Sequence, residues 1–244
     1  MKWLARWKLK KGAQLNFNQT TALLGEVLGT RINSGPFAGM NYIDVANGSV
    51  WWAKIIGTYE CELEPVMNEV FSRKYDVIID VGCAEGYYAV GLAYKTNAVV
   101  HAFDINPDAL INVKRLAELN KLTSRVHVSG KFDPSMLNQF QNQKVFLICD
   151  IEGAEKDLLD PEVYPQLREV DVLVEVHDGH EQGEIDQVLR TRFDKTHEIR
   201  QIVYNRNHPS RRSALPDVAA RHVVKSLTEE GRKLGVTWLY LKRR

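Results

Sequence analysis

Cysteine is scarce in this sequence, and long apolar runs are absent. The three cysteines, Cys61, Cys83 and Cys149, stand alone in a chain of 244 residues, which argues against a disulfide framework or a cysteine-based zinc site. No apolar stretch is long enough to span a bilayer. The basic start over residues 1–8 is not followed by the apolar core of a signal peptide. We therefore expect a cytoplasmic protein without a membrane partner.

An excess of charge of either sign is also missing. The formal net charge is +1, from 32 basic and 31 acidic residues, so the chain has no general attraction to nucleic acid or to acidic surfaces. With 44% hydrophobic and 26% charged residues it has the composition of an ordinary globular protein. We do not expect a nucleic-acid partner, and the composition leaves the oligomeric state open.

The first part of the chain differs from the rest. Apolar residues recur at helical spacing over residues 20–28 and 62–72, while residues 34–40 are rich in turn formers. These pieces are too short and irregular to predict an independent core. We therefore predict an N-terminal cap over residues 1–74, followed by a cofactor-binding domain over residues 75–244.

Strands and helices alternate from Asp76 onward. Short β-branched runs predict strands, and stretches with helical periodicity lie between them. The predicted strands cover residues 77–81, 98–103, 125–129, 145–149, 172–176, 199–204 and 236–241. This pattern predicts an α/β fold with a Rossmann-like, doubly wound, seven-stranded and mainly parallel sheet. The final strand is a candidate for antiparallel insertion, since no helix follows it.

A glycine turn follows the first predicted strand and suggests a ligand site. Gly82 and Gly86 bracket it, and glycine lets backbone approach a ligand closely. Ala84 and Glu85 break the G-x-G-x-x-G pattern of a pyrophosphate site, and no G-K-[ST] ending is present. Asp80 and Glu85 would repel a pyrophosphate. Acidic groups suit a cationic, hydroxyl-rich ligand such as S-adenosylmethionine, although Gly-x-x-x-Gly also occurs by chance.

Asp104, at the end of the second predicted strand, is placed to bind a ribose. A carboxylate there can accept hydrogen bonds from two ribose hydroxyls, as an acidic residue does in dinucleotide folds. The alternative is that Asp104 only caps the helix that begins at Pro107, a role that Asn106 can also fill. The glycine turn upstream favours the ribose interpretation.

These motifs resemble those of a known family. Asp80-x-Gly82-x-x-x-Gly86 and Phe103-Asp104 resemble the first two motifs of class I S-adenosylmethionine-dependent methyltransferases. The run 150–155, Asp-Ile-Glu-Gly-Ala-Glu, resembles the D-x-E-G-x-E signature of FkbM-type methyltransferases, and Glu175-Val176-His177 resembles their E-x-H strand ending. Residues 57–60, Gly-Thr-Tyr-Glu, are similar to a segment of some members. The resemblance covers residues 57–180, and the turn over residues 83–85 departs from it.

The resemblance implies S-adenosyl-L-methionine as the cofactor and a pose for it. The methionine part would approach Gly82 and Gly86, with Asp80 attracting the ammonium, directly or through water. Asp104 would hold the ribose and Ile105 would contact the adenine. The cofactor-binding residues expected on this basis are Tyr59, Glu60, Asp80, Gly82, Cys83, Ala84, Glu85, Gly86, Asp104, Ile105, Lys131, Phe132 and Asp150. Phe132 is equally a candidate for the core.

Polar residues after the fourth and fifth predicted strands are candidates for catalysis. Asp150, Glu152 and His177 would face the cofactor there, and Glu175 shares a strand face with His177. Histidine can act as a base near neutral pH, although an ordinary surface histidine is an equal alternative. Asp150, Glu152, His177, Asp178 and His180 also form a candidate set of metal ligands. We expect no metal, because hard cations prefer carboxylates and water to imidazole.

The absence of one motif limits the class of molecule that can accept the methyl group. No [DN]-P-P-[YF] follows the fourth predicted strand, which disfavours methylation of base amines. We expect O-methylation of a hydroxyl on a small molecule or a glycan. Alternatives are an NAD-type oxidoreductase, an RNA-directed methyltransferase and a non-catalytic cofactor-binding module. The basic stretch 206–212 is interpreted as a solvated loop, with a phosphate-binding segment or a lid over the acceptor as alternatives.

Overall fold

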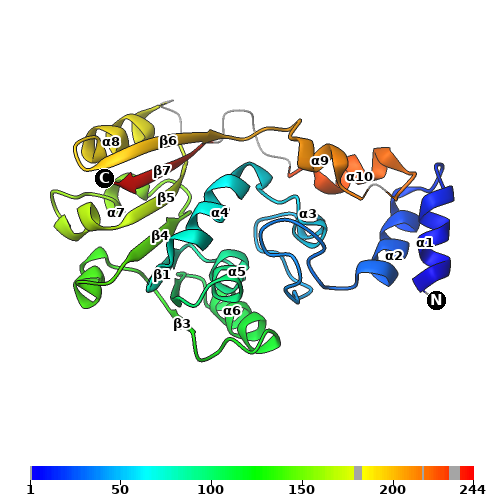
Figure 1. The fold of residues 1–244 in the computed structure, drawn as a ribbon, viewed down its shortest axis with the longest axis horizontal. Helices are drawn as coiled ribbons and strands as arrows, with labels where there is room; N and C mark the ends of the chain where they lie inside the picture. Colours follow the sequence, from blue (N-terminus) through cyan, green and yellow to red (C-terminus); the bar gives the residue numbers. More distant parts are fainter. Residues whose placement is uncertain (1, 179–182, 216, 231–236) are drawn as a thin grey trace. The chain divides into compact units, whose positions relative to one another are not determined.

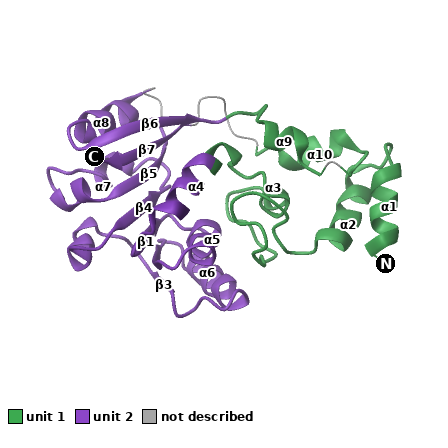
Figure 2. Ribbon diagram, in the orientation of Figure 1, with its two compact units in different colours: residues 1–64, 205–232 green, residues 65–204, 233–244 purple. Residues whose placement is uncertain are grey.

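The computed structural model describes residues 2–178, 183–215, 217–230 and 237–244, and it divides into two compact units. Unit 1 consists of Met1–Glu64 and Asn205–Arg232, and unit 2 of Pro65–Tyr204 and Lys233–Arg244 (Figure 2). Residues 205–232, which the sequence assigned to the second domain, thus belong to unit 1. Across the described residues, no helix combines the length and apolar composition that crossing a membrane requires.

Unit 2 is built on one seven-stranded sheet (Figure 1). Its strands are β1 (Val77–Val81), β2 (Val99–Phe103), β3 (Val126–Ser129), β4 (Val145–Cys149), β5 (Asp171–Val176), β6 (His197–Val203) and β7 (Thr237–Arg243). Their order is β3-β2-β1-β4-β5-β7-β6, and β7 runs antiparallel to both of its neighbours. The predicted Rossmann-like, mainly parallel sheet is confirmed, as is the antiparallel insertion of its last strand.

The strand order reverses direction between β1 and β4. The chain runs outward from β1 through β2 to β3, and then returns to place β4 on the other side of β1. In open α/β sheets the carboxyl ends of the strands at such a point form the usual ligand crevice. The turns after β1, β2, β4 and β5 are therefore the part of unit 2 in which to look for a site.

Helices cover both faces of this sheet. They are α4 (Glu64–Arg73), α5 (Tyr87–Lys95), α6 (Pro107–Leu119), α7 (Glu155–Leu158) and α8 (Glu184–Phe193), with 3₁₀ turns η2 (Pro134–Phe140) and η3 (Pro165–Glu169). Figure 1 shows α4, α5 and α6 on one side of the sheet and α7 and α8 on the other. Alternate residues of β1 divide between the faces: Val77, Ile79 and Val81 belong to the same hydrophobic cluster as Leu189 and Phe193 of α8, and Asp80 points the other way.

Unit 1 is helical and joins two distant parts of the sequence. Its elements are α1 (Lys2–Lys11), α2 (Phe17–Leu28), α3 (Trp51–Ile56), η1 (Cys61–Leu63), α9 (Pro209–Ser213) and α10 (Arg221–Thr228). Leu9, Leu24 and Ile56 from the first part share a hydrophobic cluster with Val224 and Leu227 of α10. The sequence predicted α2, but neither α1 nor α3.

A buried arginine ties these two parts together. Arg211 of α9 is 5% exposed and donates a hydrogen bond to Glu62 at 3.0 Å, and it also forms an ion pair with Glu230. The interpretation of residues 206–212 as a solvated basic loop is therefore wrong at Arg211. This guanidinium is buried and pairs with two carboxylates of its own chain, so it is not available to bind a phosphate.

Candidate active site

The turn after β1 is tied to the protein's own backbone. Gly82 has φ +81°, and a Cβ atom at this position would lie 1.7 Å from the carbonyl oxygen of Asp150. The N–H groups of Gly82 and Cys83 donate to the carbonyl oxygen of Phe103 at 2.9 and 3.0 Å. The close approach that Gly82 permits is thus to the end of β4, and the turn bridges the ends of three strands. A contact of Gly82 with a cofactor stays a prediction.

Gly86 has a comparable structural role. Its φ is +96°, and an added Cβ would lie 3.2 Å from a side-chain methyl of Val113 on α6. The glycine lets α5 begin at Tyr87 directly beside α6. Between the two glycines, Cys83 and Glu85 are buried, so any contact that they make with a ligand would come from their backbone.

Asp80 is a buried acid beneath this turn. Its side chain is 3% exposed, and its Oδ2 atom has no hydrogen-bond partner among the residues described. Burial, reinforced by the negative charge of Asp150, raises the pKa of Asp80 to about 8. At neutral pH most of this carboxyl is protonated. A ligand cation placed against it would favour the ionised form instead.

Asp104 holds two loops in place. Its Oδ2 atom accepts a hydrogen bond from the N–H of Ala84 at 2.9 Å, and its Oδ1 atom accepts one from the N–H of Asn106 at 2.8 Å. The first bond holds Ala84 in a left-handed conformation, with φ +47°. Asp104 therefore does more than lead into α6, because it fixes the β1 turn. Each carboxylate oxygen keeps a second lone pair for a ribose hydroxyl.

Three residues predicted to bind the cofactor, Ile105, Lys131 and Phe132, differ sharply in exposure. Ile105 is 84% exposed, which is unusual for a large apolar side chain beside a buried strand end. Lys131 is exposed as well. Phe132 is buried against Phe103, with the ring centroids 5.0 Å apart. Ile105 and Lys131 are accessible to a ligand, while Phe132 belongs to the core, the alternative that the sequence left open for it.

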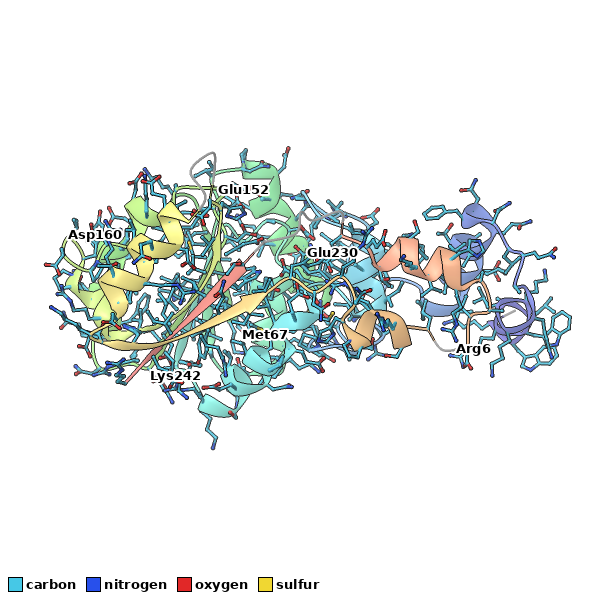
Figure 3. The ribbon with its side chains drawn as sticks, turned by 90° about the horizontal axis from the view of Figure 1, so that it is seen from above. Arg6, Met67, Glu152, Asp160, Glu230 and Lys242 are labelled. Atoms are coloured by element: carbon cyan, nitrogen blue, oxygen red, sulfur yellow. The ribbon has the colours of Figure 1, made fainter. Side chains whose placement is uncertain are left out.

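The carboxyl ends of β4 and β5 bring together the residues predicted to be catalytic. The Nε2 atom of His177 lies 3.5 Å from Oε2 of Glu152, 3.6 Å from Oδ1 of Asp150 and 3.9 Å from Oε1 of Glu175. Glu152 is exposed at the edge of this group, and its side chain is labelled in Figure 3. Its φ of +58° belongs to the tight turn that follows β4.

Glu155 completes this group, although the sequence gave it no role. Its Oε1 atom lies 2.8 Å from Nδ1 of His177 and accepts the N–H of Gly153 at 3.0 Å. Glu155 is fully buried. Burial alone would raise the pKa of Glu155, but the hydrogen bond to His177 lowers it below its usual range. The signal for this residue was present, because Glu155 is the last acid of the D-x-E-G-x-E run.

The surrounding carboxylates change the predicted role of His177. Burial lowers the pKa of this imidazole, but the hydrogen bond to Glu155 and the charges of Asp150 and Glu175 outweigh burial and raise it to about 9. At neutral pH the ring therefore carries a proton on each nitrogen and cannot accept another. The expectation of a base that is ready near pH 7 does not hold for this state of the protein.

The candidate metal ligands are only partly gathered. Asp150, Glu175 and His177 each offer a ligand atom, and these atoms lie within 4.8 Å of one another. Asp178 instead accepts the N–H of Ile185 at 2.8 Å, which places it at the start of α8. His180 lies outside the described residues. The expectation that the site uses no metal stays a prediction.

Two of the predicted cofactor-binding residues belong to unit 1. Tyr59 is buried, and the Lys54 ammonium lies 4.7 Å from the centre of its ring. The N–H of Glu60 donates to Glu230 at 3.1 Å, and Glu60 has a left-handed φ of +44°. These contacts are structural, and a cofactor role for either residue stays a prediction.

Comparison with known proteins finds similarity to solved structures of methyltransferases. The chain matches no family model and no curated protein sequence. An O-methyltransferase from Bacillus cereus, in complex with SAH, is 12% identical, with 72% of this chain and 78% of that chain covered and a TM-score of 0.45. An rRNA methylase from Streptococcus thermophilus is 12% identical, with 73% and 94% covered and a TM-score of 0.47. A ribosomal protein L11 methylase from Lactobacillus delbrueckii subsp. bulgaricus is 16% identical, with 72% and 76% covered and a TM-score of 0.44. At these identities and TM-scores the similarity does not assign this chain to a family.

Proposed function

We propose that this protein is an S-adenosylmethionine-dependent methyltransferase that acts on a hydroxyl of a small molecule or a glycan. One observation carries the proposal. The strand ends flanking the reversal of strand order bear a ribose-type acid with an exposed apolar neighbour, Asp104 and Ile105, and a cluster of acids around His177. Asp104 and Ile105 suit the binding of a nucleoside, and the cluster around His177 suits the removal of a proton from the acceptor.

The proposed cofactor fits the residues of the β1 and β2 turns. Asp104 has lone pairs left for the ribose hydroxyls, and Ile105 offers an uncovered apolar side chain to the adenine. Asp80 has a buried oxygen without a hydrogen-bond partner in the described part of the chain, which suits an ammonium better than a phosphate. Asp150, Lys131 and the backbone of residues 82–86 complete the binding set in unit 2. Tyr59, Glu60 and the cap of residues 1–74 stay in the proposal on the resemblance alone.

The acid cluster would manage the acceptor proton. Bound S-adenosylmethionine supplies a methyl group on a sulfonium, and the acceptor oxygen must be aligned with it and lose its proton. His177 can remove the acceptor proton only when its Nε2 is unprotonated. Glu155 orients the ring by holding Nδ1–H, so that Nε2 faces Asp150 and Glu152. The proposed base is neutral His177, with Asp150 and Glu152 aligning the hydroxyl.

Calorimetric titration with S-adenosylhomocysteine and with NAD tests the cofactor. We expect S-adenosylhomocysteine to bind, and Asp104→Asn to weaken it roughly tenfold or more, because a hydrogen bond to a charged group contributes about 1.5–3 kcal/mol. Asp133→Asn is a matched control: its Oδ1 accepts the N–H of Ser135 at 2.8 Å, as that of Asp104 does from Asn106. Binding of NAD without binding of S-adenosylhomocysteine would refute the proposal.

A screen with methyl-labelled cofactor tests the acceptor. Small hydroxyl compounds, sugars and a structured RNA are offered in parallel to the wild-type protein and to His177→Gln. Label in the hydroxyl compounds or sugars that disappears in His177→Gln supports the proposal. Label in the RNA alone would replace the acceptor class while leaving the cofactor assignment intact. Cofactor binding without transfer to any acceptor would favour the non-catalytic module.

A further inference from the structure

Helix α1 has two apolar faces, and only one of them is covered. Ala5 and Leu9 are buried, and Leu9 packs in the hydrophobic cluster of unit 1. Trp3, Leu4 and Trp7 are 77%, 48% and 52% exposed. At about 100° per residue, the three exposed side chains lie within roughly one third of the helix circumference, opposite Ala5 and Leu9. The outward apolar face is thus not needed to hold α1 in place.

Cations surround this exposed face. The helix contains five basic residues and no acidic one, as its sequence KWLARWKLKK shows. Lys10 forms an exposed ion pair with Asp217 at 3.2 Å. By helical position Lys11 lies within the apolar face, Arg6 and Lys10 lie on one flank and Lys8 on the other (Arg6 is labelled in Figure 3). The whole chain has a net charge of only +1, so this concentration is local.

We propose that α1 docks unit 1 onto an anionic membrane surface. Tryptophan suits the boundary between acyl chains and headgroups, because its ring is apolar and its N–H can bond to the polar layer. Lysine and arginine can bury their stems and keep their charges at the lipid phosphates. This occupant fits better than a single-stranded nucleic acid, because the apolar side chains, Leu4 included, form one contiguous patch. The proposal does not depend on the proposed enzymatic activity.

This inference revises the expectation of no membrane partner. That expectation rested on the absence of a spanning segment and on the net charge of +1. A helix lying on the surface needs no spanning segment, and its charge is local. Because the apolar patch is small, binding should be reversible and should require both the tryptophans and anionic lipid. It should also weaken as salt screens the cations.

Flotation of the full chain with vesicles tests the proposal. We expect the protein to float with vesicles of phosphatidylcholine and phosphatidylserine, and not with phosphatidylcholine alone. The double variant Trp3→Ala/Trp7→Ala should lose this binding while keeping its far-ultraviolet circular dichroism, because both residues are exposed. Ile111→Ala/Lys114→Ala on α6 removes one exposed apolar and one basic side chain elsewhere, and it should float like the wild type.

Two further measurements make the result decisive. Acyl-brominated lipid should quench the tryptophan fluorescence of the wild-type protein on vesicles. Loss of this quenching in the Trp3→Ala/Trp7→Ala variant alone would identify Trp3 and Trp7 as the tryptophans that contact the lipid. Absence of flotation at low salt would overturn the proposal, as would equal flotation of that variant. It would also be overturned if the two tryptophans instead supported binding of single-stranded RNA or self-association in sedimentation velocity.

Discussion

The Nδ1 atom of His177 lies 2.8 Å from the Oε1 atom of the fully buried Glu155. This bond fixes the orientation of the imidazole and presents its other nitrogen to Asp150, Glu152 and Glu175. Because both its hydrogen bond and these charges favour the imidazolium, the ring is a cation at neutral pH.

Replacing Glu155 should release the proton of His177. In Glu155→Gln the charged hydrogen-bond partner is lost, so the pKa of His177 should fall from about 9 toward its usual value. Titration of the imidazole resonances by nuclear magnetic resonance measures this shift. His197, at the opposite end of the sheet and bonded to the carbonyl of Val170, is an internal control that should not move. An unchanged His177 titration would contradict the pairing.

The rate of methyl transfer should rise with pH. If neutral His177 is the base, activity increases as its proton is lost and levels off above its pKa, which is about 9 without ligands. The positive charges of a bound sulfonium cofactor would lower that value. Initial rates across pH 6–10 give the apparent pKa, and Glu155→Gln should shift the rise to lower pH. A flat profile would rule out His177 as the base.

Stability should fall as pH rises, through Asp80. The pKa of this carboxyl is about 8 in the folded protein and near 4 when unfolded, so between these values the folded state holds a proton that the unfolded state releases. The free energy of unfolding is therefore lowered progressively from about pH 4 to pH 8. Asp80→Asn removes this term, and in urea titrations its stability relative to wild type should increase over that range. The same difference at pH 4 and pH 8 would contradict the assignment.

An alanine at Gly82 should destabilise the fold by more than its dihedral angle alone explains. The added Cβ would meet the carbonyl oxygen of Asp150 at 1.7 Å. Gly183, with φ +88° and no atom of the described residues within 4 Å of its added Cβ, is the matched control. Gly183→Ala should cost about 1–2 kcal/mol. Gly82→Ala should cost well above that, or prevent folding, as seen by thermal unfolding. Equal costs would show that the β1 turn relaxes freely.

Shortening Ile105 should affect binding and not stability. Because the side chain is 84% exposed, Ile105→Ala should leave the unfolding midpoint unchanged. The loss of apolar contact with an adenine should weaken S-adenosylhomocysteine binding by about 3–30-fold, at roughly 0.8 kcal/mol per buried methylene. Val163→Ala, another exposed apolar truncation, should leave binding unaltered. Unchanged binding in Ile105→Ala would place the adenine elsewhere.

The sheet could be predicted because its strands are short, β-branched runs bounded by turn residues. The strands at 77–81 and 145–149 match to the residue, and the others differ by three residues or fewer where both limits are described. Helix α1 was missed because its lysines and outward tryptophans mask the two-residue buried face. The burial of Arg211 was missed because Glu62 is far from it in sequence, and the residue pattern did not indicate that Glu230 would pair with it.

The proximity of the candidate residues could be predicted from the sequence, but the protonation state of His177 could not. Strand-end acids must gather at one edge of a parallel sheet, which brought Asp150 and His177 together as expected. The bond between His177 and Glu155 depends on the left-handed turn at Glu152 and Gly153, a conformation that the residue pattern did not specify. The charge of His177 follows from that bond, so the residue pattern could not predict this charge either.

The position of β7 between β5 and β6 has a consequence for the order in which the protein is made. During synthesis β5 and β6 emerge before the strand that joins them, so a nascent chain ending near Tyr204 has no hydrogen-bonding partner for the outer edge of β5. Glu175 pairs with Trp238 only once β7 has left the ribosome. The candidate active site therefore reaches its final form only after β7 has been made, and until then the exposed edge of β5 is a point at which nascent chains can associate.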